Sequence, residues 1–253
     1  MRWREEFFAA QHAGLAFIEW IYDVGGDDMN PIVSAEGIAE MLEISRLTKV
    51  QVNSLCGDYF MSEPLLKGCE NGRRSRFEKL VWLLDRCEAA KISRIVLPFV
   101  DSSKVDGDTE IAELIDLLRS TAAFAAERNI EIHLETSLPP ELVAFVLKSV
   151  NHTSMKVNYD SGNSASLGFD VDKEFAAYGP YIGSVHIKDR LLGGLTVPLG
   201  QGITNFEKLA RNLKCLPYNG DLILQVARGV SGDELNWARE NRVFVEKLLE
   251  RDF

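Results

Sequence analysis

Short runs of β-branched and apolar residues alternate along the chain with longer segments in which apolar residues recur at helical spacing. The short runs predict β-strands and the longer segments predict α-helices, because each spacing matches one face of the corresponding element. The predicted strands are residues 15–20, 50–55, 94–100, 130–135, 155–160, 184–189 and 222–227, and the predicted helices include 2–14, 75–91, 108–129, 139–150 and 204–213. Uninterrupted alternation of strand and helix predicts a parallel sheet. No linker divides the chain, so residues 1–253 are treated as a single domain.

The segment MKVNYD (155–160) has an unusual pattern for a strand that is covered on both sides. One of its faces is apolar, whereas the other carries Lys156, Asn158 and Asp160. A strand covered on both faces is expected to be apolar on both. The same alternation gives a polar face to four other predicted strands, with Gln51 and Asn53, then Glu131, His133 and Glu135, then Ser184, His186 and Lys188, and finally Gln225. Polar faces from many strands satisfy one another only where they converge, as they do inside a closed barrel.

These polar faces favour an α/β fold of the (β/α)8 TIM-barrel type over an open sheet. No GxGxxG motif follows the first predicted strand, which removes the main sign of a dinucleotide-binding sheet. Only seven strands are predicted, whereas the barrel needs eight. The chain opens in the predicted helix 2–14, and LTVPL (195–199) is too short to replace a strand, so we expect a barrel lacking or shortened at its first N-terminal strand. Because a missing strand exposes sheet edges, we also expect contacts in a homo-oligomer, rearranged helices, or low stability.

Composition and charge narrow the range of partners. The net charge of −10 opposes binding to nucleic acid, although a local cationic site can still accept a small phosphorylated ligand. The four cysteines form no CxxC pair and match no zinc spacing, which suggests reduced thiols and a cytoplasmic protein. No run of about 18 apolar residues is present, so no membrane span is expected.

Candidate chemistry gathers where the predicted strands end. In TIM barrels the reactive groups lie at the carboxyl ends of the strands, and here those ends carry Glu19, Cys56, Asp58, Asp101, Glu135, Asp160, His186 and Gln225. Glu135, Asp160 and His186 end three consecutive strands and are therefore expected to be neighbours. Two carboxylates and an imidazole suit one divalent ion, of Mn, Co, Fe, Mg or Zn. The alternative is that the three are hydrogen-bonded polar groups in a wet barrel mouth.

Several of these segments resemble a known family. HLETS, VNYDSGNSASLG and SVHIKDR, followed by VPLGQG, look like the sugar and sugar-phosphate isomerase and epimerase branch of the xylose isomerase-like TIM barrels. LAFIEWIYD resembles the second strand of that branch, in which a glutamate often meets the substrate, and this implies a substrate contact for Glu19. The resemblance covers nearly the whole chain. It also implies a short strand before the first helix, and we expect this chain to lack that strand.

The resemblance implies a role for each matching residue. Family members bind one divalent ion through a Glu, an Asp, a His and a second Glu, and their two glutamates move protons. The first three fall on Glu135, Asp160 and His186, but the fourth falls on Gln225, which offers a carbonyl oxygen to a metal and cannot act as a base. Lys188, Glu19 and Asp58 are alternative sources of a second proton-transferring group.

Cationic and amide side chains complete the predicted substrate site. Lys188 and Arg190 follow His186 directly, and Arg228 follows the last predicted strand, so each is a candidate to bind a phosphate or carboxylate. The alternatives are that Lys188 forms an ion pair with Asp160 or Asp189 inside the barrel and that Arg228 is a surface residue. Asn163 matches a position that often contacts substrate in related enzymes, and the alternative is that it serves the turn. His133, one layer below Glu135, is expected to be a hydrogen-bonded interior residue.

The function that these residues imply is a metal-dependent isomerase or epimerase of a sugar or sugar phosphate, acting through an enediolate. One alternative is an altered, non-catalytic barrel that binds a sugar, because Gln225 replaces the second acid. A second alternative, the DNA-repair endonuclease relatives of this barrel, needs more histidines around a metal cluster than the four that this chain contains.

Overall fold

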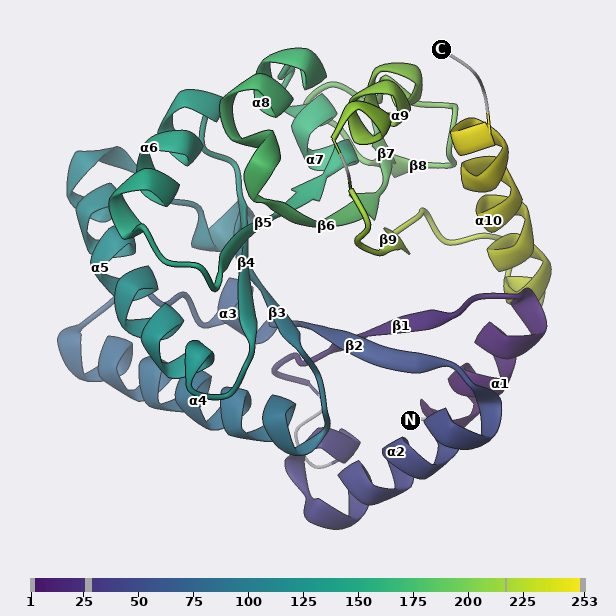
Figure 1. Cartoon of the computed structure of the whole chain (residues 1–253), viewed down its shortest axis with the longest axis horizontal. Coiled ribbons are helices and arrows are strands. Elements are labelled where there is room, and N and C mark those ends of the chain that lie inside the picture. The colour runs from purple at the N-terminus through teal and green to yellow at the C-terminus, as the bar shows by residue number, and fades with distance from the viewer. Residues whose placement is uncertain (1–2, 26–28, 217, 251–253) are drawn as a thin grey trace.

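The computed structural model describes residues 3–25, 29–216 and 218–250, and their strands form a nearly closed parallel barrel with helices around it (Figure 1). The seven strands follow one another in the order β1-β2-β3-β4-β5-β6-β9. Their bounds are β1 Phe17–Ile21, β2 Gln51–Cys56, β3 Arg94–Phe99, β4 Glu131–Thr136, β5 Met155–Asp160, β6 Ile182–Ile187 and β9 Leu222–Leu224. All six pairings in this sheet are parallel. The predicted TIM-barrel class and its seven strands are confirmed.

Helices cover the outside of the sheet. The α-helices are α1 Trp3–Ala13, α2 Ala35–Thr48, α3 Tyr59–Ser62, α4 Glu70–Ala89, α5 Gly107–Ala126, α6 Pro140–Val150, α7 Ser161–Ser166, α8 Val171–Tyr178, α9 Phe206–Cys215 and α10 Glu234–Glu250, with 3-10 turns at Pro31–Val33, Asp101–Ser103 and Gly179–Tyr181. The predicted helix 2–14 corresponds to α1, with Arg2 outside the described residues. Within the described part of the chain, no helix has the length and apolar character that a membrane crossing requires.

The barrel is open on one side, between β1 and β9. These two strands are the ends of the sheet order and come near one another without pairing (Figure 1). The segment 195–199 does not fill this position. Its residues Thr196–Val197 form β8, which pairs antiparallel with β7 (Asp189–Arg190) in a separate two-stranded ribbon. Helices α1 and α10 pack against each other outside the open side.

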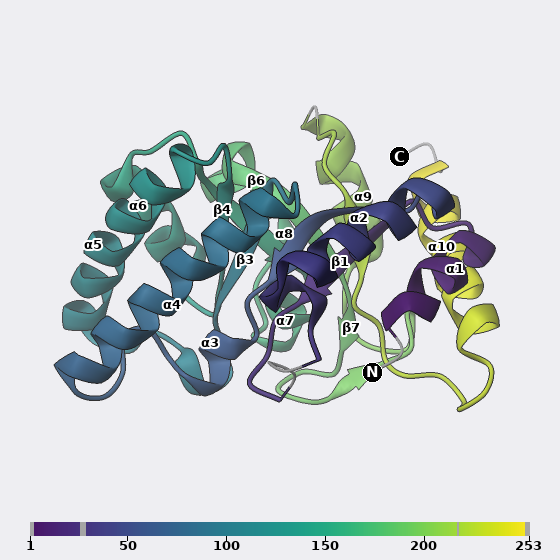
Figure 2. The same ribbon diagram turned by 90° about the horizontal axis from the view of Figure 1, so that it is seen from below.

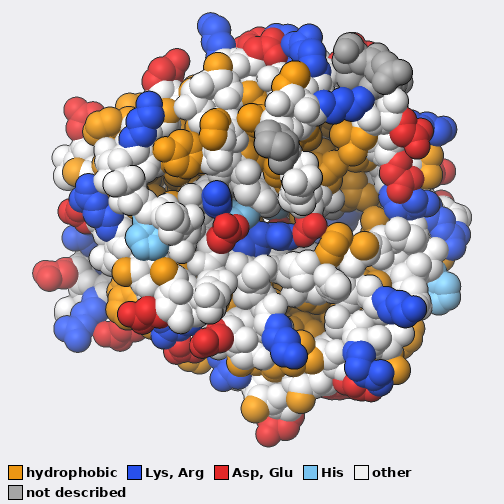
Figure 3. All heavy atoms as spheres, viewed as in Figure 1, with side chains coloured by type: hydrophobic (Ala, Val, Ile, Leu, Met, Phe, Trp, Pro, Cys, Tyr) orange, Lys and Arg blue, Asp and Glu red, His pale blue; other side chains and the backbone are white. Residues whose placement is uncertain are grey.

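The apolar core lies between the outer face of the sheet and the helices. Leu55, Ile95, Leu134 and Val157 belong to this core and are almost fully buried. The short helices α3 and α7 and the strand β7 lie at one end of the barrel (Figure 2), where α3 and α7 follow directly from the ends of β2 and β5. On the face of the molecule seen in Figure 3, acidic and basic side chains are interspersed, and a few charged groups gather at the centre.

In β2 the residues that face the barrel interior are not the ones that the sequence predicted. Gln51 is exposed and Asn53 is half-buried, and the two bond to each other at the start of β2. Ser54 and Cys56, on the opposite face, are buried, and Ser54 reaches Glu19 in the barrel interior. The polar residues at 51 and 53 are therefore rim residues, and their polarity reflects contact with solvent.

A bulge between β5 and β6 makes room for a buried histidine. The register shifts here, so that Val157 pairs with Ile182 whereas Asn158 pairs with Ser184, and Gly183 is the extra residue. A Cβ at Gly183 would stand 2.6 Å from the His133 ring and 2.8 Å from Cβ of Lys156. Bulges in strands often carry glycine where another group approaches closely. Gly183 therefore allows the interior polar residues of β4, β5 and β6 to pack.

Replacing Gly183 with alanine is expected to lower the free energy of unfolding by about 1–3 kcal/mol, because the added methyl group overpacks the interior. Urea denaturation of Gly183→Ala and wild type measures this difference. Gly25→Ala is the matched control, since no described side chain lies within 4 Å of the place where its Cβ would stand. Equal stability of Gly183→Ala and wild type would contradict this account of the bulge.

Candidate functional site

Three strand ends bring their ligand-type side chains together inside the barrel mouth. Glu135 on β4, Asp160 on β5 and His186 on β6 each offer one ligand atom, and these atoms lie within 4.8 Å of one another. Nδ1 of His186 is 3.6 Å from Oε2 of Glu135 and 4.0 Å from Oδ2 of Asp160. All three residues are buried. The convergence expected from their positions at consecutive strand ends is found.

Two buried side-chain atoms in this region that could bind a metal ion have no hydrogen-bond partner among the described residues. They are Nδ1 of His186 and Oε1 of Gln225. Gln225 follows β9, and its backbone N–H donates to the carbonyl of Ile187, which keeps it next to β6. An unpaired buried polar atom is costly in a folded protein. One imidazole nitrogen, one amide oxygen and two carboxylates fit the donor set of a divalent ion.

Glu19 is hydrogen-bonded to His186 and fixes the orientation of the imidazole ring. Nε2 of His186 is 2.7 Å from Oε1 of Glu19, and the hydroxyl of Ser54 donates to Oε2 at 2.5 Å. Burial alone would raise the pKa of Glu19, but the charge and hydrogen bond of His186 hold it below its usual value. An ionised carboxylate only accepts hydrogen bonds, so Nε2 carries the proton and Nδ1 faces Glu135 and Asp160. This is the arrangement that orients a metal-binding histidine.

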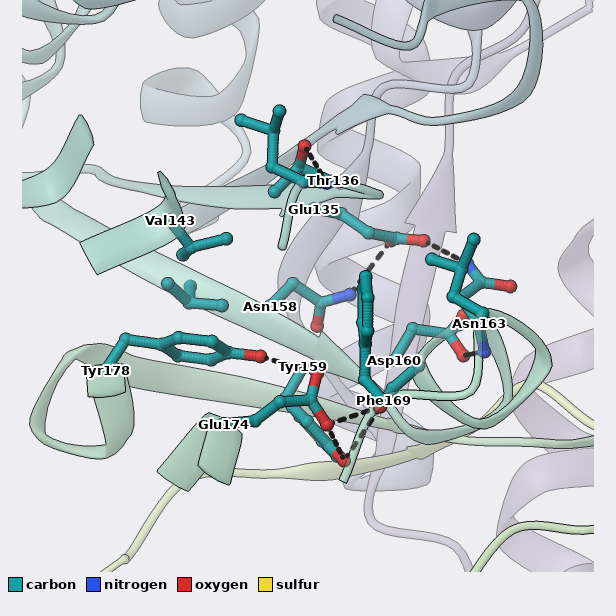
Figure 4. A pocket seen from close by; sticks show the side chains of 14 residues that line it. Glu135, Thr136, Val143, Asn158, Tyr159, Asp160, Asn163, Phe169, Glu174 and Tyr178 are labelled. Atoms are coloured by element: carbon teal, nitrogen blue, oxygen red, sulfur yellow. Dashed lines mark hydrogen bonds between the residues drawn. The ribbon is translucent and has the colours of Figure 1, made fainter. Parts of the chain in front are cut away.

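Two amides hold the carboxylate of Glu135 (Figure 4). Asn158 donates to Oε2 at 2.9 Å and Asn163 donates to Oε1 at 2.8 Å. Burial and the neighbouring charge of Asp160 raise the pKa of Glu135 to about 7. Burial would lower the pKa of His186, but the carboxylates of Glu19, Glu135 and Asp160 raise it to about 9. The site therefore holds protons in the place where a cation would stand.

Asp160 connects the site to helix α7 and to Lys188. Its Oδ1 accepts the backbone N–H groups of Gly162 and Asn163 at the start of the helix, and its Oδ2 accepts Nζ of Lys188 at 3.0 Å. Lys188 crosses close above Gly162, where a Cβ would stand 2.5 Å from Cγ of the lysine. Lys188 thus forms an ion pair with Asp160, which is the alternative to anion binding that the sequence left open for this residue.

A cavity of about 220 Å³, here called the mouth cavity, opens at the carboxyl ends of the strands. Its lining comprises Cys56, Asp58, Met61, Pro98, Val100, Asp101, Glu135, Asn163, Lys188, Arg190, Thr196 and Gln225. Arg190 donates to Oδ1 of Asn163 at 2.8 Å and to the carbonyl of Gly194. Glu19 is not among the lining residues, and Arg228 is exposed outside it. The structure therefore does not bring Arg228 to the site.

His133 forms part of a buried chain of hydrogen bonds beneath the site. Its Nδ1 is 2.7 Å from the hydroxyl of Ser184, which donates to Oδ1 of Asn158, and its Nε2 is 3.1 Å from Glu131. Burial is the main cause that lowers the pKa of His133. The expectation of a hydrogen-bonded interior histidine is confirmed. Asn158, which joins this chain to Glu135, could have been identified from its place on the same strand face as Asp160.

Asp189 holds the loop that follows β6. This residue is 1% exposed, and its carboxylate accepts three backbone N–H groups, from Gly200, Gly202 and Thr204. The loop carries Thr196 into the lining of the mouth cavity. The sequence analysis missed this role, although the closely spaced glycines at 200 and 202 are typical of a turn whose backbone approaches another group.

Glu174 is another buried carboxylate, and it fixes helix α7 against α8 (Figure 4). The hydroxyls of Tyr159, Ser164 and Tyr178 all donate to it, at 3.1, 2.5 and 2.9 Å. Because Ser164 is next to Asn163 in α7, this cluster supports the amide that holds Glu135.

Known proteins resemble this chain over most of its length. L-ribulose-5-phosphate 3-epimerase UlaE of Escherichia coli is 24% identical over 233 residues, which cover 88% of this chain and 82% of that protein. The zinc-bound IolI protein matches with a TM-score of 0.80 at 17% identity, over 99% of this chain and 95% of that chain. A D-psicose 3-epimerase determined with D-fructose matches with a TM-score of 0.77 at 14% identity, over 99% and 95% of the two chains. The family model described as xylose isomerase-like TIM barrel matches residues 7–248, so the chain belongs to the xylose isomerase-like TIM barrel family.

Proposed function

We propose that this protein is a divalent-metal-dependent epimerase or isomerase of a ketose or ketose phosphate. The observation that carries the proposal is the unpartnered Nδ1 of His186 next to the carboxylates of Glu135 and Asp160, together with the unpartnered Oε1 of Gln225 in the lining of the mouth cavity. The epimerase names of the relatives support the substrate class. Cytoplasmic location and a homo-oligomeric state remain predictions.

Glu135, Asp160, His186 and Gln225 would hold the ion. When bound, a divalent ion in such a site polarises a carbonyl group and stabilises the negative charge that develops on oxygen. Asp160 contributes charge, and His186 contributes a nitrogen that Glu19 keeps correctly protonated. Gln225 contributes a neutral oxygen, so the four donors carry one negative charge fewer than they would with a second glutamate. The metal identity stays open among Mn, Co, Fe, Mg and Zn.

Glu135 is the proposed base. It takes the proton from the carbon next to the carbonyl, the C–H electron pair becomes the new C=C bond, and the carbonyl π pair moves to oxygen to give an enediolate. A base whose pKa is raised toward neutrality suits this step, and burial together with Asp160 raises that of Glu135. Asn158 and Asn163 fix the carboxylate in position.

Lys188, Arg190 and Asn163 are proposed to recognise the substrate. All three line the mouth cavity, and two of them are cationic. A phosphate or a polyhydroxy chain accepts hydrogen bonds from such groups. Lys188 is also a candidate to stabilise charge on the substrate once a metal ion has taken its place at Asp160. For Glu19 we propose an indirect role, through His186.

One observation favours a second candidate, a barrel that binds a sugar without converting it. Gln225 has no acidic proton to give or take, and Lys188 forms an ion pair with Asp160. In this case the protein would bind a ketose with no exchange of its carbon-bound hydrogen.

Solvent isotope exchange separates the two candidates. In D2O with Mn²⁺, wild type is expected to introduce deuterium next to the carbonyl of L-ribulose 5-phosphate, D-fructose or D-psicose, as followed by proton NMR. Glu135→Gln is expected to lower the exchange rate at least about 100-fold, because the base is lost. If wild type exchanges none of the three ketoses while binding one of them, the non-catalytic candidate is favoured.

Metal affinity is expected to rise with pH. A metal ion replaces the proton on Nδ1 of His186, whose pKa is raised to about 9, and the proton on Glu135, whose pKa is raised to about 7. Both protons must leave below neutrality and mainly one above it, so Mn²⁺ should bind roughly 1000-fold more tightly at about pH 8 than at about pH 6. Isothermal titration calorimetry in buffers of different ionisation enthalpy measures the affinity and the protons released. An affinity independent of pH would rule out His186 as a ligand.

Gln225 is expected to act as a neutral ligand. Gln225→Ala should weaken Mn²⁺ binding about tenfold through the loss of one donor, whereas Gln225→Glu should strengthen it at about pH 8 through an added charge. Calorimetric titration of both variants measures these changes. The interpretation fails if the alanine variant binds Mn²⁺ as tightly as wild type.

A further inference from the structure

Epimerisation needs a second group that returns a proton to the face opposite Glu135, and Gln225 cannot provide it. We propose that Asp58, at the end of β2, is this second proton-transferring residue. The inference rests on the proposed function and ranks the three candidates that the sequence left open, Lys188, Glu19 and Asp58.

Asp58 follows β2 and lines the same mouth cavity as Glu135 and Gln225. The proposed metal donors end β4, β5, β6 and β9, which are consecutive in the sheet order, whereas β2 lies among the remaining strands. In that order one strand separates β2 from β4, which carries Glu135, and three strands separate β2 from β6. Asp58 and Glu135 both line the same cavity of about 220 Å³. A substrate bound there would meet both carboxyl groups, which come from different strands.

The surroundings of Asp58 leave its carboxylate available to this cavity. Asp58 occupies the N-cap position of α3, but its side chain accepts no hydrogen bond from the helix backbone. Aspartate at this position usually does accept one. The thiol of Cys56 donates a hydrogen bond to Oδ1 of Asp58 at 3.1 Å, and Cys56 lines the same cavity. Asp58 is half-buried, and burial is the main cause that raises its pKa, which favours a protonated fraction.

The other carboxylates and the lysine fit the role less well. Glu19 is bound to His186 and Ser54 and does not line the cavity. Lys188 is paired with Asp160 and follows β6, on the same side as the proposed metal. Asp101 also lines the cavity, but it is exposed at the rim, where solvent competes for its proton.

The proton balance is complete without a co-reactant. Glu135 takes the proton from one face of the carbon, and the enediolate C=C pair then forms a new C–H bond with the proton of the Asp58 carboxyl group on the other face. The oxygen pair returns to the carbonyl, Asp58 is left ionised, and Glu135 is left protonated. Exchange with water restores both groups.

Asp58→Asn should separate the two halves of this reaction. In D2O with Mn²⁺, using whichever of L-ribulose 5-phosphate, D-fructose and D-psicose wild type exchanges, the variant is expected to keep the deuterium exchange into the starting ketose. Formation of the epimer should fall at least about 100-fold. Glu135→Gln should lose both. A change in the ratio of exchange to epimer formation is a result that a merely structural defect would not produce.

Controls distinguish this role from loss of charge, metal or fold. Asp23→Asn removes another carboxylate whose charge acts on Asp58, and it should keep the wild-type ratio. Calorimetry should find Mn²⁺ affinity unchanged in Asp58→Asn, because Asp58 is not among the proposed ligands. If the asparagine variant does not fold, Asp58→Glu should retain part of the epimer formation because it keeps the carboxyl group.

The other possible results contradict either the proposed function or the role of Asp58. No exchange by wild type removes the proposed function and this inference with it. Exchange by wild type without epimer formation removes the role of Asp58 and leaves the function standing. Equal loss of exchange and epimer formation in a folded, metal-binding Asp58→Asn also removes that role, as does an unchanged ratio.

Discussion

The close approach of Glu135 and Asp160 inside the barrel mouth is the constraint that the rest of the site accommodates. Their ligand atoms lie within 4.8 Å of each other and of His186, in a buried place. Two like charges about 4 Å apart repel by about 4 kcal/mol even in a moderately polar protein environment. A positive charge has to compensate, and the chain supplies it as protons and as the ammonium group of Lys188. A divalent ion bound to Glu135, Asp160 and His186 would also compensate this negative charge.

The surrounding residues act mainly by fixing the donors. Glu19 determines which nitrogen of His186 is protonated, and Asn158 and Asn163 determine how Glu135 is turned. These partners depend in turn on the barrel, whose outer strand faces pack against the helices and leave the interior to polar side chains. Gly183 shows how tightly this interior is filled, since a single methyl group there would collide with His133. A rigid site of this kind loses little free energy to reorganisation when a ligand binds.

The distribution of functional groups around the rim is uneven. The metal-type donors end β4, β5, β6 and β9, Asp58 ends β2, and the open side lies between β1 and β9. Gln225 follows the strand next to this open side, so the neutral donor lies where the barrel is least enclosed. Under the proposal made above, the carboxylate of Asp58 would provide the acid–base chemistry that glutamine cannot.

The sequence by itself determined the barrel class, the seven strands and the meeting of Glu135, Asp160 and His186, because side-chain alternation and strand order are local and periodic. It failed for Gln51 and Asn53, since polarity at a strand start does not tell an interior position from a solvated rim. Only the tertiary structure decided that Glu19 serves His186, that Asp189 ties down the loop of residues 190–204, and that Arg228 stands outside the mouth cavity. Those contacts join residues far apart in the chain, and their geometry depends on bulges, loop paths and side-chain directions that no spacing encodes.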